Sequence, residues 1–231
     1  MNRKKCIITC AILMTAGTML TGCAGSTARM LFYGWVRYHE NFTYLGVRNG
    51  QLGNEYSEIA VASKKFPGEE IRFFWGRYED GSETYQDNYL GYLLREQIEE
   101  RVLQLAEQVY GTCTVYYDVG GPIKGIDYPV QMSVEEFCAD GRNGISLWIG
   151  VCGQVKYEQE AKQMAEFLDL LRKHEIWAKG TTVYVGEEEY QKLKRENHYR
   201  FLEENKLSGT KIFWLNAKDG KQYDPQWYAY E

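Results

Sequence analysis

The strongest pattern in the chain is a row of apolar residues spaced three and four positions apart between residues 87 and 110. Such spacing places side chains on one face of an α-helix, here those of Leu90, Leu94, Ile98, Val102, Leu105 and Val109. Asp87 or Asn88 can cap this helix, and Gly111 ends it. A long helix with one apolar face must bury that face, so we expect a second layer of structure to pack against it.

Segments of β-strand character come before this helix. Glu58–Lys64 alternates loosely, Pro67-Gly68 marks a turn, and Ile71–Tyr78 is rich in aromatic residues. The two runs predict a β-hairpin. Residues 45–54 hold several glycines and asparagines and are expected to form turns. Residues 28–40 mix apolar and basic side chains, which is compatible with a juxtamembrane helix.

Helices and strands alternate through the rest of the chain. The expected order is strand Thr112–Val119, short helix Met132–Ala139, strand Gly144–Val151, helix Glu158–His174, strand Thr181–Val185, charged helix Glu187–Glu204, strand Thr210–Leu215 and strand Gln222–Trp227. Ser133 and Glu136 have the spacing of a capping box at the start of the short helix. The pattern predicts an α+β fold, with an N-terminal β-hairpin and amphipathic helices packed on a mixed sheet.

Two parts of this order match in outline. Thr114-Val115-Tyr116-Tyr117 follows the first long helix, and Thr182-Val183-Tyr184-Val185 follows the second. An internal α-β-α-β duplication accounts for the match, and so does the alternation common to α/β chains. The globular part is expected over residues 55–231, as one domain or as two subdomains of about 55–130 and 131–231.

The first 23 residues have a different character. Arg3, Lys4 and Lys5 precede an apolar run over residues 6–20, which ends in Leu20-Thr21-Gly22-Cys23. A basic start, a short apolar stretch and small residues before a cleavage point are typical of a secretory signal. The final quartet resembles the lipobox of bacterial lipoprotein precursors. That resemblance implies that residues 1–22 are removed by cleavage between Gly22 and Cys23, and that a diacylglyceryl group is joined to the Cys23 sulfur.

The same segment is compatible with two simpler structures. An uncleaved membrane-spanning helix fits poorly, because residues 6–20 span only about 22 Å as a helix, whereas the apolar core of a bilayer is about 30 Å thick. An ordinary signal peptide followed by an unmodified cysteine is the second possibility. In the lipoprotein interpretation two acyl chains give stable anchoring. Residues 23–54 then form a lipidated cysteine, a short tether over 24–27 and an irregular or partly helical lead-in.

The charge of the mature chain excludes some partners. Without its three N-terminal basic residues the chain keeps 24 basic against 32 acidic side chains, a net charge of −8. Nucleic-acid binding requires a basic surface, so no nucleic-acid partner is expected. Electrostatic docking on anionic lipid is disfavoured for the same reason. We therefore expect a protein held on the extracytoplasmic face of the cell membrane by the lipid on Cys23.

No catalytic residue, metal site or cofactor is predicted. His39, His174 and His198 lack metal-ligand spacing, and no nucleophile motif is present. Cys138 with His174 would be a nucleophile–base pair, but a structural cysteine is the simpler interpretation. The acidic residues around the hairpin, Glu69, Glu70, Asp80 and Glu83, would suit glycan hydrolysis if paired. Otherwise they form a solvated rim.

Three cysteines and an aromatic tail remain. A disulfide between Cys113 and Cys152 is compatible with export, because both residues fall on expected strands. Three buried free thiols, including Cys138, are the alternative. At the C-terminus, Trp227, Tyr228 and Tyr230 form a binding surface for a protein or a sugar if they are exposed, or an edge strand packed on the sheet if they are not.

Three functions are compatible with these features. The first is a non-enzymatic lipoprotein that binds or scaffolds an envelope protein or glycan. The second is an enzyme acting on a cell-wall or extracellular polymer, and the third is the solute-capturing component of a transporter. Residues 55–118, with Asp87-Asn88-Tyr89 between the hairpin and the long helix, also resemble small uncharacterised exported proteins of Gram-positive bacteria. That resemblance implies a place in the cell envelope and no activity.

Overall fold

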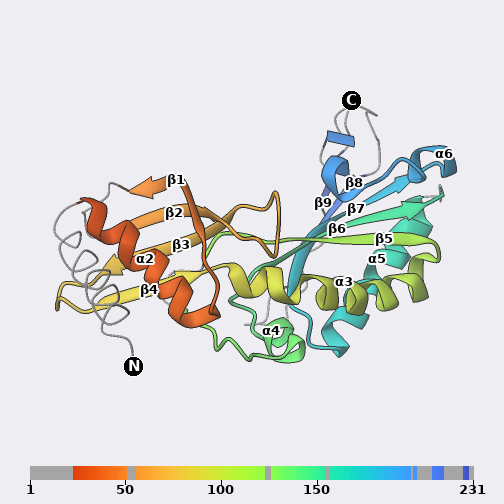
Figure 1. Cartoon of the computed structure of the whole chain (residues 1–231). Coiled ribbons are helices and arrows are strands. Elements are labelled where there is room, and N and C mark those ends of the chain that lie inside the picture. The colour runs from red at the N-terminus through yellow and green to blue at the C-terminus, as the bar shows by residue number, and fades with distance from the viewer. Residues whose placement is uncertain are drawn as a thin grey trace, which may run out of the picture. The chain divides into compact units, whose positions relative to one another are not determined.

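The chain folds into two compact units, which are shown in a computed structural model (Figure 1). The structure describes residues 23–50, 56–122, 126–153, 157–198, 200–201, 210–215 and 226–228. Unit 1 holds the described residues up to Tyr92 together with Gly121–Val130. Unit 2 holds Leu93–Gly120 and the described residues from Gln131 onward. Helices and a mixed sheet are both present, so the predicted α+β class is confirmed.

Unit 1 is a four-stranded antiparallel sheet with a helix on one face. The elements are α2 (Cys23–Tyr38), β1 (Thr43–Gly50), β2 (Tyr56–Ala62), β3 (Ile71–Arg77) and β4 (Glu83–Asp87). The strands lie in the order β1-β2-β3-β4, and α2 crosses the sheet against β3 (Figure 1). The expected hairpin is the β2–β3 pair, in which Ile59 lies opposite Phe73.

The flanks of this hairpin differ from expectation. Residues 43–50 form strand β1 instead of turns, and the segment ending at Asp87 forms strand β4. The register of β1 on β2 shifts between Tyr44 and Gly46 and again between Val47 and Asn49. Such bulges break the alternation by which a strand is recognised. The expected tether over 24–27 is also wrong, because these residues belong to α2.

The core of unit 1 lies between α2 and the sheet. Ile59, Val61, Ile71 and Phe73 alternate along β2 and β3 and are fully buried, as is Met30 on α2. Gly34 is the point of closest approach, because a Cβ atom there would lie 2.4 Å from the Phe73 ring. The helix therefore packs closely on the sheet only because this position has no side chain.

Unit 2 is a five-stranded mixed sheet with helices. After α3 (Tyr89–Tyr110), which begins in unit 1, the elements are β5 (Cys113–Asp118), α4 (Val134–Ala139), β6 (Ile145–Cys152), α5 (Tyr157–Lys173), β7 (Ala178–Val185), α6 (Glu187–Tyr190), a 3-10 helix (Arg195–Asn197), β8 (Thr210–Trp214) and β9 (Gln226–Tyr228). The strands lie in the order β5-β6-β7-β8-β9. Of the described strands in this sheet, β6 and β7 run parallel, and the other neighbours are antiparallel.

Two local expectations in unit 2 had different outcomes. The capping box of α4 is confirmed, since Ser133 and Glu136 each bond the backbone of the other. The charged helix expected over Glu187–Glu204 is wrong, because α6 is four residues long and Lys194 has an extended backbone with φ −142° and ψ 159°. Acidic residues at a helix start favour initiation, but they do not continue a helix through an extended residue.

The order of unit 2 repeats. Both α3-β5-α4-β6 and α5-β7-α6-β8 are α-β-α-β stretches, and the two strands of each stretch pair antiparallel. A duplication as the origin of this order stays a prediction. The unit boundary differs from the expected division near residue 130, because β5 pairs with β6 and so draws residues 93–120 into unit 2.

Candidate functional site

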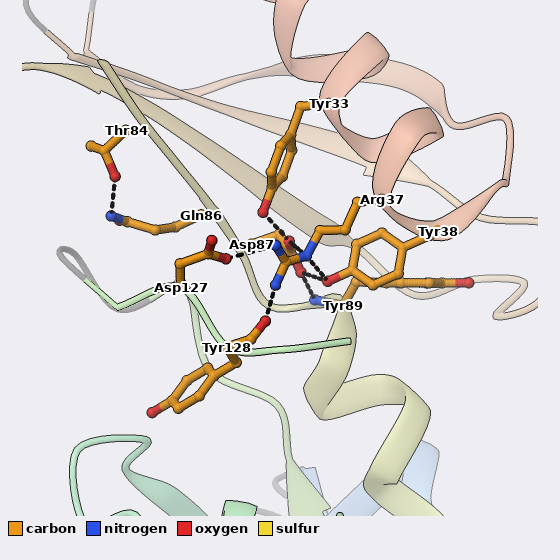
Figure 2. A network of polar contacts seen from close by, with 9 residues as sticks. All are labelled: Tyr33, Arg37, Tyr38, Thr84, Gln86, Asp87, Tyr89, Asp127 and Tyr128. Carbon is orange, nitrogen blue, oxygen red and sulfur yellow. Dashed lines mark hydrogen bonds and ion pairs between the residues drawn. The ribbon is translucent and has the colours of Figure 1, made fainter. Parts of the chain in front are cut away.

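A polar network in unit 1 is centred on the carboxylate of Asp87, at the end of β4 (Figure 2). Its side chain is 3% exposed. Oδ2 accepts a hydrogen bond from the Tyr33 hydroxyl at 2.8 Å, and Oδ1 accepts one from the Tyr38 hydroxyl at 2.7 Å. Oδ1 also accepts from the backbone N–H of Tyr89 at 2.8 Å, in the first turn of α3. One carboxylate thus fastens α2 to the start of α3.

Arg37 extends this network to a distant part of the sequence. Its Nε lies 3.5 Å from Asp87 Oδ2 and donates to the Tyr38 hydroxyl at 3.0 Å. One Nη is 2.7 Å from Asp127 Oδ1, and the other donates to the carbonyl of Tyr128. Figure 2 shows the guanidinium between the Asp87 carboxylate and the segment that carries Asp127 and Tyr128. Arg37 therefore holds the segment that carries Asp127 and Tyr128 to the helical part of unit 1.

The electrostatics of this network fix its protonation. Burial raises the pKa of Asp87, and the two tyrosine hydroxyls and the Arg37 charge oppose that rise. Burial and the neighbouring carboxylate raise the pKa of Tyr33 and of Tyr38 well above that of an exposed tyrosine. Both hydroxyls therefore stay protonated and donate to Asp87 at any physiological pH. They are hydrogen-bond donors here and not bases.

A second carboxylate continues the network around Tyr89. The hydroxyls of Tyr89 and Ser63 both donate to Glu40, and the Lys64 N–H donates to Glu40 Oε1 at 3.1 Å. The Tyr89 ring is enclosed by edge contacts with three further rings, those of Tyr38, Phe42 and Phe66. The carboxylates of Asp87 and Glu40 thus accept hydrogen bonds from other residues of the protein. The arrangement is thus suited to locking α2 in place.

The outer side of α2 has the opposite character. Phe32, Trp35 and Val36 are 64%, 48% and 49% exposed, and the rings of Phe32 and Trp35 stack with their centroids 5.8 Å apart. We call these three residues the α2 apolar face. The edge strand β1 of the same unit also exposes Tyr44, Leu45 and Val47. The sequence indicated a helix near residues 28–40, but only the packing of Met30 and Gly34 inward shows which side is left outside.

The anchor residues fall at the start of the described chain. Gly22 lies outside the described residues, and Cys23 is the first residue of α2. Cleavage between them and lipid attachment to Cys23 remain predictions. Among the residues that the structure describes, no helix combines the length and apolar character needed to cross a bilayer.

The predicted tail surface is described only in part. Trp227 and Tyr228 lie in β9, the edge strand of unit 2, where Tyr228 pairs with Thr210 and Trp227 with Lys211. Their side chains and the whole of Tyr230 lie outside the described residues. Pairing onto the sheet edge was one of the two expected outcomes, and the binding surface itself remains a prediction.

Of the two alternatives for the cysteines, the disulfide between Cys113 and Cys152 is not formed. Cys113, Cys138 and Cys152 are free thiols. On the β5–β6 ladder Cys113 lies opposite Val151, and successive side chains of a strand point to opposite faces. Cys113 and Cys152 therefore leave the sheet on different faces and cannot be bridged without moving the strands.

The acidic residues considered for glycan hydrolysis form ion pairs or hydrogen bonds with neighbouring residues. Glu70 accepts from Arg48 at 2.8 Å, and Glu83 pairs with Arg29 and with Arg77, each at 2.8 Å. Asp80 accepts from the Ser82 hydroxyl and N–H within a turn.

Cys138 is buried on α4, and burial raises its pKa to about 11, which disfavours the nucleophilic thiolate. In the described part of the chain, no cluster of three or more histidines, cysteines or carboxylates is arranged to hold a metal ion.

Comparison with known proteins gives a weak structural similarity. No family model and no curated protein matches the chain. A crystal structure of a DUF5037 family protein from Ruminococcus gnavus ATCC 29149 is similar at 16% sequence identity and a TM-score of 0.43. The alignment covers 84% of this chain and 93% of that one. A likeness this weak assigns no activity, so the function must be inferred from the residues themselves.

Proposed function

We propose that this protein is a bacterial lipoprotein, held on the extracytoplasmic face of the cell membrane by a diacylglyceryl group on Cys23. Its α+β domain acts there as a binding or scaffolding module for another component of the envelope. The supporting sequence is Leu20-Thr21-Gly22-Cys23 after a short apolar run. A covalent lipid also suits a mature chain of net charge −8, which has no electrostatic attraction to anionic lipid.

The observation that carries the proposal is the position of Cys23 at the first turn of α2. The same helix is fastened to the sheet by Arg37 and Asp87. A lipid on Cys23 would therefore hold folded unit 1 directly at the membrane, without a flexible stalk. Anything that the domain binds then lies close to that surface.

The part of unit 1 that we expect to bind a partner is the edge strand β1, whose exposed side chains are apolar. The edge strand β1 exposes Tyr44, Leu45 and Val47, and an edge strand offers unpaired backbone groups to a partner. We expect an envelope protein to use this edge. A photo-crosslinking residue at Leu45 should give a discrete adduct in intact cells, whereas one at exposed Tyr78 should not. Equal labelling from both positions would argue against a specific partner at β1.

The anchor is tested by Cys23→Ser in the full-length precursor. The wild-type protein should fractionate with membranes and carry a lipidated N-terminal cysteine by mass spectrometry, and the variant should be released or remain an unprocessed precursor. Cys152→Ser is the matched control, since it removes a thiol from β6 and leaves the signal intact. Membrane association that survives Cys23→Ser without a retained signal segment would overturn the proposal.

Capture of a small solute is the second candidate, because the chain divides into two compact units as a two-lobed capture protein does. A solute that binds only the folded protein raises its melting temperature, and the rise grows with the logarithm of the solute concentration divided by its Kd. A panel of sugars, amino acids and peptides tested by thermal shift distinguishes this candidate. A shift produced by one class of solute, and still rising with its concentration, would favour capture over scaffolding.

A further inference from the structure

Helix α2 is apolar on two opposite sides. Met30 and Gly34 face the sheet and are buried, while the α2 apolar face of Phe32, Trp35 and Val36 points outward. Residues at positions i, i+3 and i+4 lie on one side of a helix, so the three form a single continuous patch. A surface helix usually carries polar residues on its outer side. This helix therefore has one apolar side whose partner is not part of the described chain.

The position of Cys23 indicates what that partner is. A helix rises about 1.5 Å per residue, so Phe32 and Val36 lie only about 14 Å and 20 Å along the axis from Cys23. Both residues belong to the same continuous helix as Cys23. If the Cys23 sulfur carries the lipid, the patch is within one helix length of the bilayer surface.

The charges of α2 fit a lipid surface. The helix has no Asp or Glu, although acidic residues outnumber basic ones in the whole chain. Its two arginines are both paired within unit 1, Arg29 with Glu83 and Arg37 with Asp87. The α2 apolar face itself carries no charge. Although the protein as a whole is acidic, this face can therefore approach anionic headgroups without electrostatic repulsion.

The composition of the patch also fits the boundary layer of a bilayer. Tryptophan is enriched at the level of the headgroups, where one side of its ring is apolar and the N–H is hydrated. Amphipathic helices lie in this plane with the apolar side buried about 5–10 Å deep. The stacked Phe32 and Trp35 rings would lose their exposure to water in that position.

We propose that α2 lies along the membrane surface, with Phe32, Trp35 and Val36 inserted among the lipid headgroups. The lipid on Cys23 holds the protein to the bilayer, and the α2 apolar face sets its orientation. This inference rests on the proposed lipoprotein function. It adds a second membrane contact, made by side chains, that fixes which surface of unit 1 faces outward.

The test uses the full-length lipidated protein in vesicles of phosphatidylcholine and phosphatidylglycerol, with and without acyl chains brominated near the headgroup. Bromine quenches only the tryptophan residues close to it. The wild-type protein should lose part of its emission in brominated vesicles, and Trp35→Phe should abolish most of that loss. Trp35→Phe keeps an aromatic ring at an exposed position, so the fold is expected to survive.

The outcomes separate this inference from the anchor. If the wild-type protein does not bind the vesicles, the lipoprotein proposal itself fails. If it binds but its quenching is absent, or is the same in Trp35→Phe, the anchor stands and the orientation of α2 is wrong. A protein crosslinked in cells from position 36, with no quenching in vesicles, would assign the patch to a protein partner instead and overturn the inference.

Discussion

The Nε atom of Arg37 on α2 lies 3.5 Å from Oδ2 of Asp87 on β4, at a carboxylate that is almost completely hidden from water. Two tyrosine hydroxyls and one backbone N–H complete the coordination of that carboxylate. A buried charge with this many partners is costly to remove, because the desolvated donors around the Asp87 carboxylate lose their common acceptor. The first prediction follows from this pair.

Asp87→Ala should destabilise unit 1 by about 3–5 kcal/mol, the usual cost of breaking a buried ion pair. The substitution leaves Arg37, Tyr33 and Tyr38 without their common acceptor. Denaturant unfolding monitored by tryptophan fluorescence measures the loss. Asp169→Ala is the control, since the Asp169–Arg172 pair is exposed on both sides and should contribute at most about 1 kcal/mol. Similar losses in the two variants would contradict the structural role of the network.

Gly34→Ala should destabilise the packing of α2 on the sheet. The added Cβ atom would lie 2.4 Å from the Phe73 ring, and such overpacking costs about 1–3 kcal/mol. The better helix propensity of alanine returns up to about 1 kcal/mol. A double-mutant cycle with Phe73→Leu isolates the clash. The cost of Gly34→Ala should shrink in the Phe73→Leu background, and an unchanged cost would show that the ring is not the cause.

The stability of unit 2 should fall as the pH rises above about 6.5, because His198 then loses its proton. Burial lowers the pKa of this histidine, but hydrogen bonds to Asp118 and to the Arg195 carbonyl outweigh burial and raise it above 6.5. A raised pKa in the folded state stabilises the protein fully below about 6.5. That contribution is lost as the pH rises through the folded-state pKa.

Unfolding free energies measured across the range from mildly acidic to mildly alkaline pH check this expectation. The wild-type protein should lose stability over the upper part of the range, and His198→Gln should show a smaller slope. Glutamine keeps a polar side chain of similar size but does not titrate. If both proteins show the same dependence, another group is responsible.

The three thiols should differ in reactivity. Burial raises the pKa of Cys113 to about 12 and that of Cys138 to about 11, so their thiolate populations are small near neutral pH. Cys152 is only partly buried. Brief alkylation of the native protein, followed by peptide mass spectrometry, should label Cys152 first, with equal labelling of all three after denaturation. Recovery of a Cys113–Cys152 disulfide peptide would contradict the register of β5 on β6.

Local sequence rules predict the parts of the fold that depend on local spacing. The apolar row from Leu90 to Val109 predicts α3, and Ile71–Tyr78 predicts β3 with its hairpin partner. Strand β1 escapes these rules because two bulges break its alternation. Strand β4 escapes them because ETYQD is a polar edge strand with one neighbour and no apolar face to mark it.

The candidate site, like the fold, could be predicted only where it depends on residues close together in the sequence. The sequence predicts Asp87 or Asn88 as the helix cap, and Asp87 does accept the backbone N–H of Tyr89. Its partners Tyr33 and Tyr38 lie 54 and 49 positions earlier, and no spacing rule connects residues so far apart. The exposure of the α2 apolar face could not be predicted from the sequence either, because it also depends on tertiary packing. Phe32 and Trp35 resemble core residues there, and only the packing of Gly34 on Phe73 shows that they lie on the other side.

The Arg37 network also has a consequence for the order of folding. Unit 1 is assembled from two separate stretches of the chain, because Asp127 and Tyr128 complete the shell of Arg37 after α3 and β5 have intervened. Chains are made and exported from the N-terminus, and their domains generally fold as they emerge. Helix α2 completes its contacts only once Tyr128, 91 positions after Arg37, has been made. Unit 1 can therefore reach its final form only after residues 93–120, the first stretch of unit 2, have left the ribosome.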